Sequence, residues 1–335
     1  MKRNYLMSKQ GGMTLIEIMV ALMIGAFLLA GVMQIFLGSK QTYRMQDNMS
    51  RMQENARFAM EFLSRDIRMA DYWGCVDPSN IESKLNIPNT FSSFANGLAG
   101  QNDDNGGNDG DADNDENGNS IWDGTDSITI RRLSASDIVV QNTPATTAAV
   151  LKVVSSTGLA VNDVVMVSNC IAGDIFQITN ITGSGTNLVH NTGGSAVPGN
   201  SSQRLEAGPE PGPPALPQAN KYGPGSNIFK LNFTDYQIRL SGGEPVLSRN
   251  INGASFQSLV EGIENMQIVY GEDTDSDGTP NYYVPAGTAG LTMNQVVSVR
   301  ITLTVRSIDA NLTSTGDGRL RRTFSSTIVL RNRLN

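Results

Sequence analysis

A long, almost entirely apolar run near the N-terminus is the feature that most limits what this chain can fold into. Between Met13 and Leu37 only Thr14, Glu17 and Gln34 are polar. The run is longer than the ~20 apolar residues that a helix needs to cross the hydrocarbon core of a membrane. It also exceeds the ~7–15 apolar residues of a secretory signal peptide, and no A-x-A-like cleavage site follows it. The run therefore predicts a membrane-spanning helix.

The charges around this run predict its orientation. Lys2, Arg3 and Lys9 precede it, so the positive-inside rule places the N-terminus in the cytoplasm and the rest of the chain in the periplasm or beyond. Glu17 lies inside the run, where an ionised carboxylate costs roughly 2.5–3.5 kcal/mol on insertion scales. Such a residue needs a partner or a function. The alternative is an ordinary signal anchor with a stray Glu17 near its cytoplasmic end.

The composition argues against an enzyme and against a nucleic-acid-binding protein. The formal net charge is −7, whereas affinity for nucleic acid comes mainly from Lys and Arg that neutralise phosphates. The net charge does not exclude a local basic patch that binds nucleic acid. The sequence contains no G-x-S-x-G, H-E-x-x-H, Walker or dinucleotide motif. The sole histidine, His190, lies in a Gly/Asn-rich stretch and is expected to be an exposed loop residue. No cofactor is expected to be required.

A second helical pattern follows the apolar run. Apolar residues recur at steps of three and four, which place them on one helical face. They are Met45, Met49, Met52, Ala56, Ala59, Leu63, Ile67 and Ala70. Because no proline occurs between Met13 and Asp71, we expect one continuous helix. The stripe either packs against a sheet or forms a groove for a partner helix.

The rest of the chain reads as a head rich in strands. Runs of β-forming residues predict strands, and the last ones alternate apolar and polar residues as in antiparallel sheets with one buried face. The predicted strands are 128–130, 164–167, 175–181, 229–233, 236–240, 297–305 and 324–330. We expect the last of them to form a meander. A Pro-rich stretch from Glu206 to Pro217 predicts a linker or semi-rigid loop that divides the head in two.

The two cysteines, Cys75 and Cys170, lack the C-x-x-C spacing of zinc or redox sites. In an extracytoplasmic head we expect them to form one disulfide. Because Cys75 follows the long helix and Cys170 follows a predicted strand, this bond would join the helix end to the sheet. Two free thiols are the alternative.

Two acidic segments have the spacing of a calcium loop. Residues 273–278 match D-x-D-x-D-G, in which alternate carboxylates converge on one cation and Gly permits the turn. The bidentate Glu of the twelfth loop position is replaced by Val284, which lowers the expected affinity. The candidate ligands are Asp273, Asp275 and Asp277. A weaker candidate set, in a run that could equally be a solvated acidic loop, is Asp113, Asp115 and Asn117.

Residues Gly11-Gly12-Met13-Thr14-Leu15-Ile16-Glu17 closely resemble the G/FTLIE site of type IV prepilins. The resemblance implies that prepilin peptidase cuts between Gly12 and Met13 and that Met13 is then N-methylated. It also implies an assembly role for Glu17, whose carboxylate can neutralise the new amine of a neighbouring subunit in an apolar bundle. The departure from the pattern is Met13, where most prepilins have Phe.

Further segments resemble the PilW family of type IV minor pilins, and residues 96–119 look like an insertion relative to that family. The similar segments are 63–70 with Gly74-Cys75, 259–264, Tyr270-Gly271 and 330–334. The resemblance implies an α+β, type IV pilin-like fold, in which the long N-terminal helix packs on an antiparallel β-sheet head. It further implies a minor pilin that helps to initiate pilus assembly in a tip complex. The implied partners are other minor pilins, the major pilin, a tip adhesin, prepilin peptidase and the inner membrane, without nucleic acid.

The expected organisation follows from these segments. It comprises a leader (1–12), the transmembrane and amphipathic parts of the helix (13–38 and 39–74), a first part of the head (75–205), the Pro-rich loop (206–218) and a C-terminal sheet (219–335). Before assembly the chain would sit in the inner membrane with a periplasmic head, and afterwards in the pilus. A type II secretion pseudopilin and a tip adhesin or DNA-uptake subunit are the alternatives.

Overall fold

A computed structural model describes residues 12–86, 97–104, 121–122, 124–135, 137–142, 149–193, 197–205 and 222–334. The described residues fall into two compact units. One combines the chain up to Gln53 with Ser307–Leu320, and the other combines Glu54–Arg306 with the chain from Arg321 onward. Every strand that the structure describes belongs to the second unit.

Helix α1 (Leu15–Arg68) is continuous, as the pattern predicts. Among the described residues it is the one helix that is long and apolar enough to cross a membrane, and its apolar window is fully exposed. The helix ends a few residues before Asp71 because its last turn tightens: Met69 and Ala70 donate their N–H groups three residues back. Asp71 then adopts a left-handed backbone with φ 63°, which ends the helix.

The apolar stripe is buried in the second unit, where Ala56, Ala59, Leu63 and Ile67 are at most 2% exposed. Core packing of this part is thereby confirmed. In the first unit the prediction for Met49 is wrong, since that side chain is 40% exposed.

Asn48 is buried next to Met49 instead, at 3% exposure. Its amide donates to the Arg44 carbonyl (2.9 Å) and to the Asp309 carboxylate (3.1 Å). A polar contact to the segment Ser307–Leu320 thus takes the place that hydropathy assigned to Met49.

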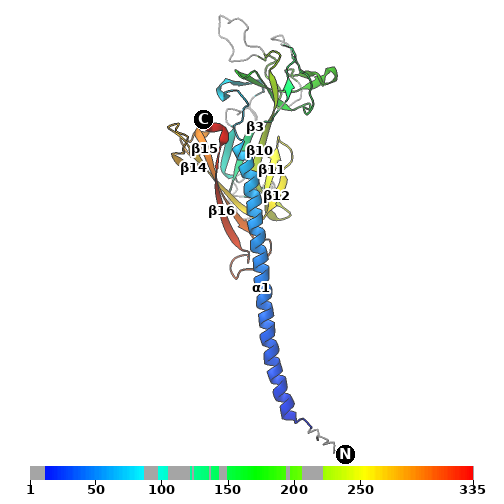
Figure 1. The fold of residues 1–335 in the computed structure, drawn as a ribbon, viewed down its shortest axis with the longest axis vertical. Coiled ribbons are helices and arrows are strands. Elements are labelled where there is room, and N and C mark those ends of the chain that lie inside the picture. Colours follow the sequence, from blue (N-terminus) through cyan, green and yellow to red (C-terminus); the bar gives the residue numbers. More distant parts are fainter. Residues whose placement is uncertain are drawn as a thin grey trace, which may run out of the picture. The chain divides into compact units, whose positions relative to one another are not determined.

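The strands of the described residues form three sheets (Figure 1). The nine-stranded sheet contains β1 (Ile81–Ser83), β2 (Leu98–Asp104), β3 (Thr125–Leu133), β4 (Ile138–Val139), β6 (Val164–Ser168), β7 (Gly173–Gln177), β10 (Asn227–Ser241), β11 (Glu244–Ile251) and β12 (Gln257–Glu261). The four-stranded sheet contains β13 (Ile263–Glu272), β14 (Tyr282–Pro285), β15 (Val296–Arg306) and β16 (Arg321–Val329). The smallest sheet contains β5 (Val150–Lys152), β8 (Asn180–Thr182) and β9 (Asn187–Val189). Short 3-10 helices are η1 (Pro78–Asn80), η2 (Gly183–Gly185), η3 (Met293–Gln295) and η4 (Arg331–Arg333).

The long strand β10 organises the largest sheet. It is one strand of 15 residues, where the sequence predicted two, and it pairs antiparallel with β3, β4, β6 and β11. Gly242 and Gly243 turn the chain into β11 with φ 62° and 82°, values that favour glycine in a two-residue hairpin turn. Strands before and after residues 206–218 therefore share one sheet, so the head is not divided into two sheets there. The stretch 206–218 itself lies outside the described residues.

The four-stranded sheet has the order β14-β13-β15-β16, with antiparallel neighbours throughout. The alternation predicted for residues 297–305 is confirmed, because Val299, Ile301, Leu303 and Val305 are fully buried. The sheet is not the expected simple meander. Since the β13–β14 hairpin already occupies one edge of β13, strand β15 pairs with the opposite edge.

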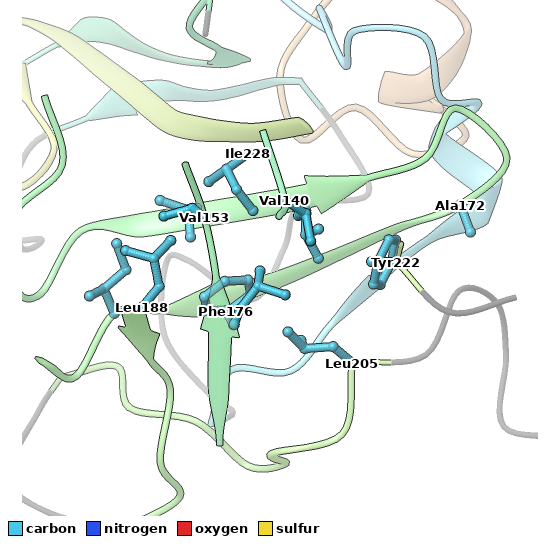
Figure 2. Close-up of a cluster of buried hydrophobic side chains, with 12 residues drawn as sticks. Val140, Val153, Ala172, Phe176, Leu188, Leu205, Tyr222 and Ile228 are labelled. Atoms are coloured by element: carbon cyan, nitrogen blue, oxygen red, sulfur yellow. The ribbon is translucent and has the colours of Figure 1, made fainter. Parts of the chain in front are cut away.

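One cluster of buried apolar side chains combines residues of the smallest sheet with residues of the nine-stranded sheet (Figure 2). Its buried apolar residues come from β5, β6, β7, β9 and β10 and from segments between the strands. His190 is fully buried beside this core, with its ring centroid 5.0 Å from that of Phe176 and its Nε2 3.2 Å from the Gln203 carbonyl. The expectation that His190 is exposed is wrong, because packing against Phe176 overrides the polar character of its sequence neighbours.

Candidate functional site

The first candidate site is the start of α1, where the processing motif lies. Gly12 and Met13 precede the helix, and the Met13 side chain is 77% exposed. Glu17 Oε2 accepts hydrogen bonds from both the backbone N–H and the hydroxyl of Thr14, each at 2.9 Å. The Glu17 N–H in turn points to the Thr14 hydroxyl at 3.4 Å. These reciprocal contacts form a capping box, which satisfies N–H groups that a helix start otherwise leaves unpaired.

Thr14 is a capping residue that the sequence reasoning missed. The signal was present, because Thr14-Leu15-Ile16-Glu17 has the [ST]-x-x-E spacing of a capping box. Glu17 therefore caps its own helix within a single chain. Its predicted contact with the amine of a neighbouring subunit stays a prediction. Of the leader, residues 1–11 lie outside the described residues.

The second candidate site is the other end of α1, where Asp71 collects hydrogen bonds from distant segments. Its Oδ1 accepts from Trp73 Nε1 (2.7 Å) and from the Gly97 N–H (2.9 Å), and its Oδ2 accepts from Arg333 Nε (2.6 Å). The Asp71 N–H donates to the Arg131 carbonyl. The side chains of Asp71 and Arg333 are only 12% and 6% exposed. A Cβ at Gly97 would collide with the Asp71 backbone, so the close approach requires glycine.

The C-terminal segment supplies the other half of this site. Asn332 donates to the Ala70 carbonyl at 2.9 Å, one of the groups that a helix end leaves without an intrahelical partner. Arg333 Nη1 donates to the carbonyls of Val296 (2.8 Å) and Met293. The closing segment 330–334 therefore connects the segment at the end of α1 to η3 and to the first residue of β15.

Strand β10 adds a contact to the last turns of α1. The buried Tyr236 hydroxyl donates to Asp66 Oδ2 at 2.6 Å. Burial, and then the hydrogen bond to Asp66, raise the pKa of Tyr236 above the usual range of a phenol. Tyr236 therefore remains a neutral donor at ordinary pH. Asp66 belongs to the segment 63–70, so this polar position of the segment has a structural role.

The segment 259–264 connects the two larger sheets. Gly262 links β12 to β13 with φ 75°, donates to the Pro245 carbonyl (3.0 Å) and accepts from the Arg306 N–H (2.8 Å). A Cβ there would lie 2.9 Å from the Arg306 carbonyl oxygen. Glu264 accepts from Arg306 at 3.3 Å and from two nitrogens of Arg321 at 2.6 and 2.8 Å. The backbone conformation of Gly262 and the ion pairs of Glu264 together give the segment 259–264 a structural role.

The predicted disulfide is confirmed. Cys75 and Cys170 are bonded, with Cα atoms 4.9 Å apart and a sequence separation of 95 residues. Cys75 follows α1 and Cys170 lies between β6 and β7. The bond thus joins the segment after the helix to the nine-stranded sheet.

The three candidate calcium ligands of the first loop lie together after β13. One carboxylate oxygen each of Asp273, Asp275 and Asp277 lies within 4.8 Å of the others. Asp273 is buried and accepts from the N–H groups of Gly278 (2.8 Å) and Asp277 (3.3 Å). Desolvation acts against ionisation of Asp273, but these hydrogen bonds outweigh it and lower its pKa. Val284, at the twelfth position, lies in β14.

The second calcium candidate, comprising Asp113, Asp115 and Asn117, lies outside the described residues. In the first loop, Asp275 and Asp277 are exposed, and Asp275 accepts from the Asn281 amide at 3.3 Å. The loop is therefore already folded around Asp273, while two carboxylates face solvent. This arrangement offers oxygen ligands of the kind that calcium prefers.

Two regions of the chain match known families. Residues 235–332 match the family described as Type IV Pilus-assembly protein W, and this region runs from Asp235 in β10 into η4. Residues 7–33 match the Prokaryotic N-terminal methylation motif, which includes the capping box of α1. No curated protein and no solved structure matches the chain. Residues 235–332 are therefore similar to the Type IV Pilus-assembly protein W family, and the chain also carries an N-terminal methylation motif on a helix that fits membrane anchoring.

Proposed function

We propose that this chain is a minor pilin that prepilin peptidase processes and that helps to initiate pilus assembly. The observation that carries the proposal is the pairing of the methylation motif, on an exposed apolar helix, with the pilus-assembly region at residues 235–332. Before assembly the helix anchors the chain in the inner membrane with its head in the periplasm. After cleavage between Gly12 and Met13, and methylation of Met13, the chain joins other minor pilins in a tip complex.

In that complex the head contacts other minor pilins and a tip adhesin, and the helix contacts the first major pilin subunits. The test is deletion of the gene, followed by counting surface pili and measuring adhesion. We expect few pili, and full recovery when the intact gene is restored. Normal numbers of pili together with lost adhesion would refute the assembly role and favour an adhesin.

Glu17 can be tested separately for its two roles. Gln at this position still accepts a hydrogen bond in a capping box, but it carries no charge to neutralise an amine. We expect Glu17→Gln to retain the helix start and to reduce pilus numbers. The matched control is Thr14→Val, which removes the capping hydroxyl and keeps the charge. Loss of pili in Thr14→Val alone would mean that capping, and not the charge, is what assembly requires.

We further propose that calcium binds weakly to Asp273, Asp275 and Asp277. Support comes from their oxygen ligands and from the buried anchor Asp273. We expect calcium to raise the melting temperature of the full chain and a chelator to reverse the rise. Asp275→Asn should reduce the response and leave the hydrogen bonds from the Asp277 and Gly278 N–H groups to Asp273 intact. A melting temperature that neither calcium nor chelator changes would overturn this proposal.

A further inference from the structure

Three ionisable side chains meet where β1 pairs with β7. The two strands are parallel, with Glu82 opposite Asp174. Lys84 directly follows β1 and lies two residues after Glu82, so the two side chains lie on the same face. Lys84 Nζ is 2.7 Å from Glu82 Oε2 and 3.9 Å from Asp174 Oδ1. An amine and two carboxyl groups are thus held together by the sheet.

Two of these three side chains, which we call the triad, are shielded from water. The side chains of Lys84 and Asp174 are 4% and 0% exposed, whereas that of Glu82 is 37% exposed. On β7, Asp174 lies between Ala172 and Phe176, which belong to the apolar core drawn in Figure 2. Burial of a charged amine and a charged carboxylate is costly. A reaction that joins the two groups in one neutral amide removes both charges.

The fully buried Tyr222 completes the site. Burial, and then the neighbouring Asp174 carboxylate, raise the pKa of Tyr222, which keeps its hydroxyl protonated. A protonated hydroxyl beside Asp174 can donate to a carboxyl oxygen on which negative charge develops. The Glu82 side chain is 37% exposed and its Oε2 lies 2.7 Å from the amine, so Glu82 can exchange protons with Lys84.

We propose that Lys84 and Asp174 form an intramolecular isopeptide bond without an enzyme. Glu82 takes a proton from Lys84 Nζ, and the lone pair on Nζ attacks Cγ of Asp174 and forms the C–N bond. Nζ then gives up a second proton, and Glu82 delivers both protons to one carboxyl oxygen of Asp174, so that the C–O bond breaks and water leaves. One ammonium and one carboxylate give one amide and one water, and no oxidant or reductant takes part. Because the fold holds the two reacting groups close together and away from water, no intermolecular encounter is needed.

The bond would strengthen a weak point of the fold. Strand β1 has only three residues and pairs with β7 alone among the described strands. The Cys75–Cys170 disulfide connects the segments that precede β1 and β7. An isopeptide bond would add a second covalent connection between the same segments, and reducing agents would not cleave it.

The test is a tryptic map of the full chain, purified in detergent and then reduced, because the disulfide joins the same two peptides. Trypsin cuts after Arg68, Arg131, Lys152 and Arg204. We expect residues 69–131 to stay joined to residues 153–204, with the joint mass lower by one water and no cut at Lys84. A free peptide 69–84 from folded, disulfide-bonded protein would overturn the proposal, and this result needs no variant.

Two comparisons sharpen the test. Lys84→Arg keeps the charge but removes the amine, so the joined peptide should disappear, and Glu82→Gln should slow its formation. The matched control is inside the chain: Lys230 Nζ lies 2.7 Å from Asp163, closer than Lys84 to Asp174, but these side chains are 31% and 16% exposed. We expect no link between Lys230 and Asp163. A link there would mean that proximity alone, and not the buried triad, produces the bond, and would refute the proposed mechanism.

Discussion

Replacement of Arg333 by Met should destabilise the head, because the Asp71 carboxylate would remain in a nearly dry site without its cation. Arg333 Nε donates to Asp71 Oδ2 at 2.6 Å, and Nη1 donates to the Val296 carbonyl at 2.8 Å. Removing one partner of a buried ion pair costs about 3–5 kcal/mol, and the residual exposure of both side chains favours the lower end. A loss of ~3 kcal/mol should lower the melting temperature by roughly 6–12 °C.

The assay is urea and thermal unfolding of the full chain in detergent, followed by tryptophan fluorescence. Trp73 reports on the site directly, because its Nε1 donates to Asp71. The control is Arg331→Met, the same change at an exposed position of the same 3-10 helix η4, which should stay within about 0.5 kcal/mol of the wild type.

A double-mutant cycle isolates the pair. Asp71→Asn removes the carboxylate charge that Arg333→Met would leave unpaired. The combined variant should therefore lose less stability than the sum of the two single variants, by about 1 kcal/mol or more. Additive losses, or an Arg333→Met variant as stable as Arg331→Met, would refute the reasoning that the C-terminal segment holds the end of α1 through Asp71.

Three further predictions follow from other contacts. Reduction of the disulfide, or Cys75→Ser with Cys170→Ser, should destabilise the head by up to ~4–5 kcal/mol in the chain-entropy model, and melting with and without reductant measures the loss. Tyr236→Phe should lower the free energy of unfolding by about 1–1.5 kcal/mol, because the hydrogen bond to Asp66 is lost. Tyr43→Phe, at a position 71% exposed, should not change it. Equal losses of stability in urea unfolding would contradict this. The hydrogen bond from Asn48, and then the Arg44 charge, lower the pKa of Asp309. The ionised Asp309 should therefore stabilise the segment 307–320 above pH ~3.9, and this stabilisation should fade as the pH falls through the pKa of Asp309 in the folded state. Peptic cleavage of the segment should rise only below pH ~3.9, and Asp309→Asn should abolish this pH dependence.

Local patterns in the sequence predicted much of the fold. The continuous helix over residues 15–68, the buried alternation at 299–305 and the start of α1 at the processing motif depend on hydropathy and capping within short windows. Secondary structure is predicted correctly from such short windows because buried positions recur with the period of the helix or strand to which they belong.

The same reasoning failed where a distant segment changed a residue's environment. Met49 was assigned to the core by its spacing, but Asn48 is buried there because Asp309 supplies a hydrogen-bond partner. His190 was taken as exposed because of its polar neighbours, but it packs on Phe176 from another strand. In both cases the deciding contact comes from outside the local window.

By itself, the sequence determined the membrane-compatible helix, its processing motif, the strand-rich head and the pair of cysteines. Only the tertiary structure decided which polar groups meet. Asp71 and Arg333 are 262 residues apart, and Lys84 and Asp174 are brought together by the parallel pairing of β1 with β7. The physical reason is that hydropathy and propensity act over a few neighbouring residues, whereas an ion pair or a reactive triad depends on burial and distance, which the assembled sheets create.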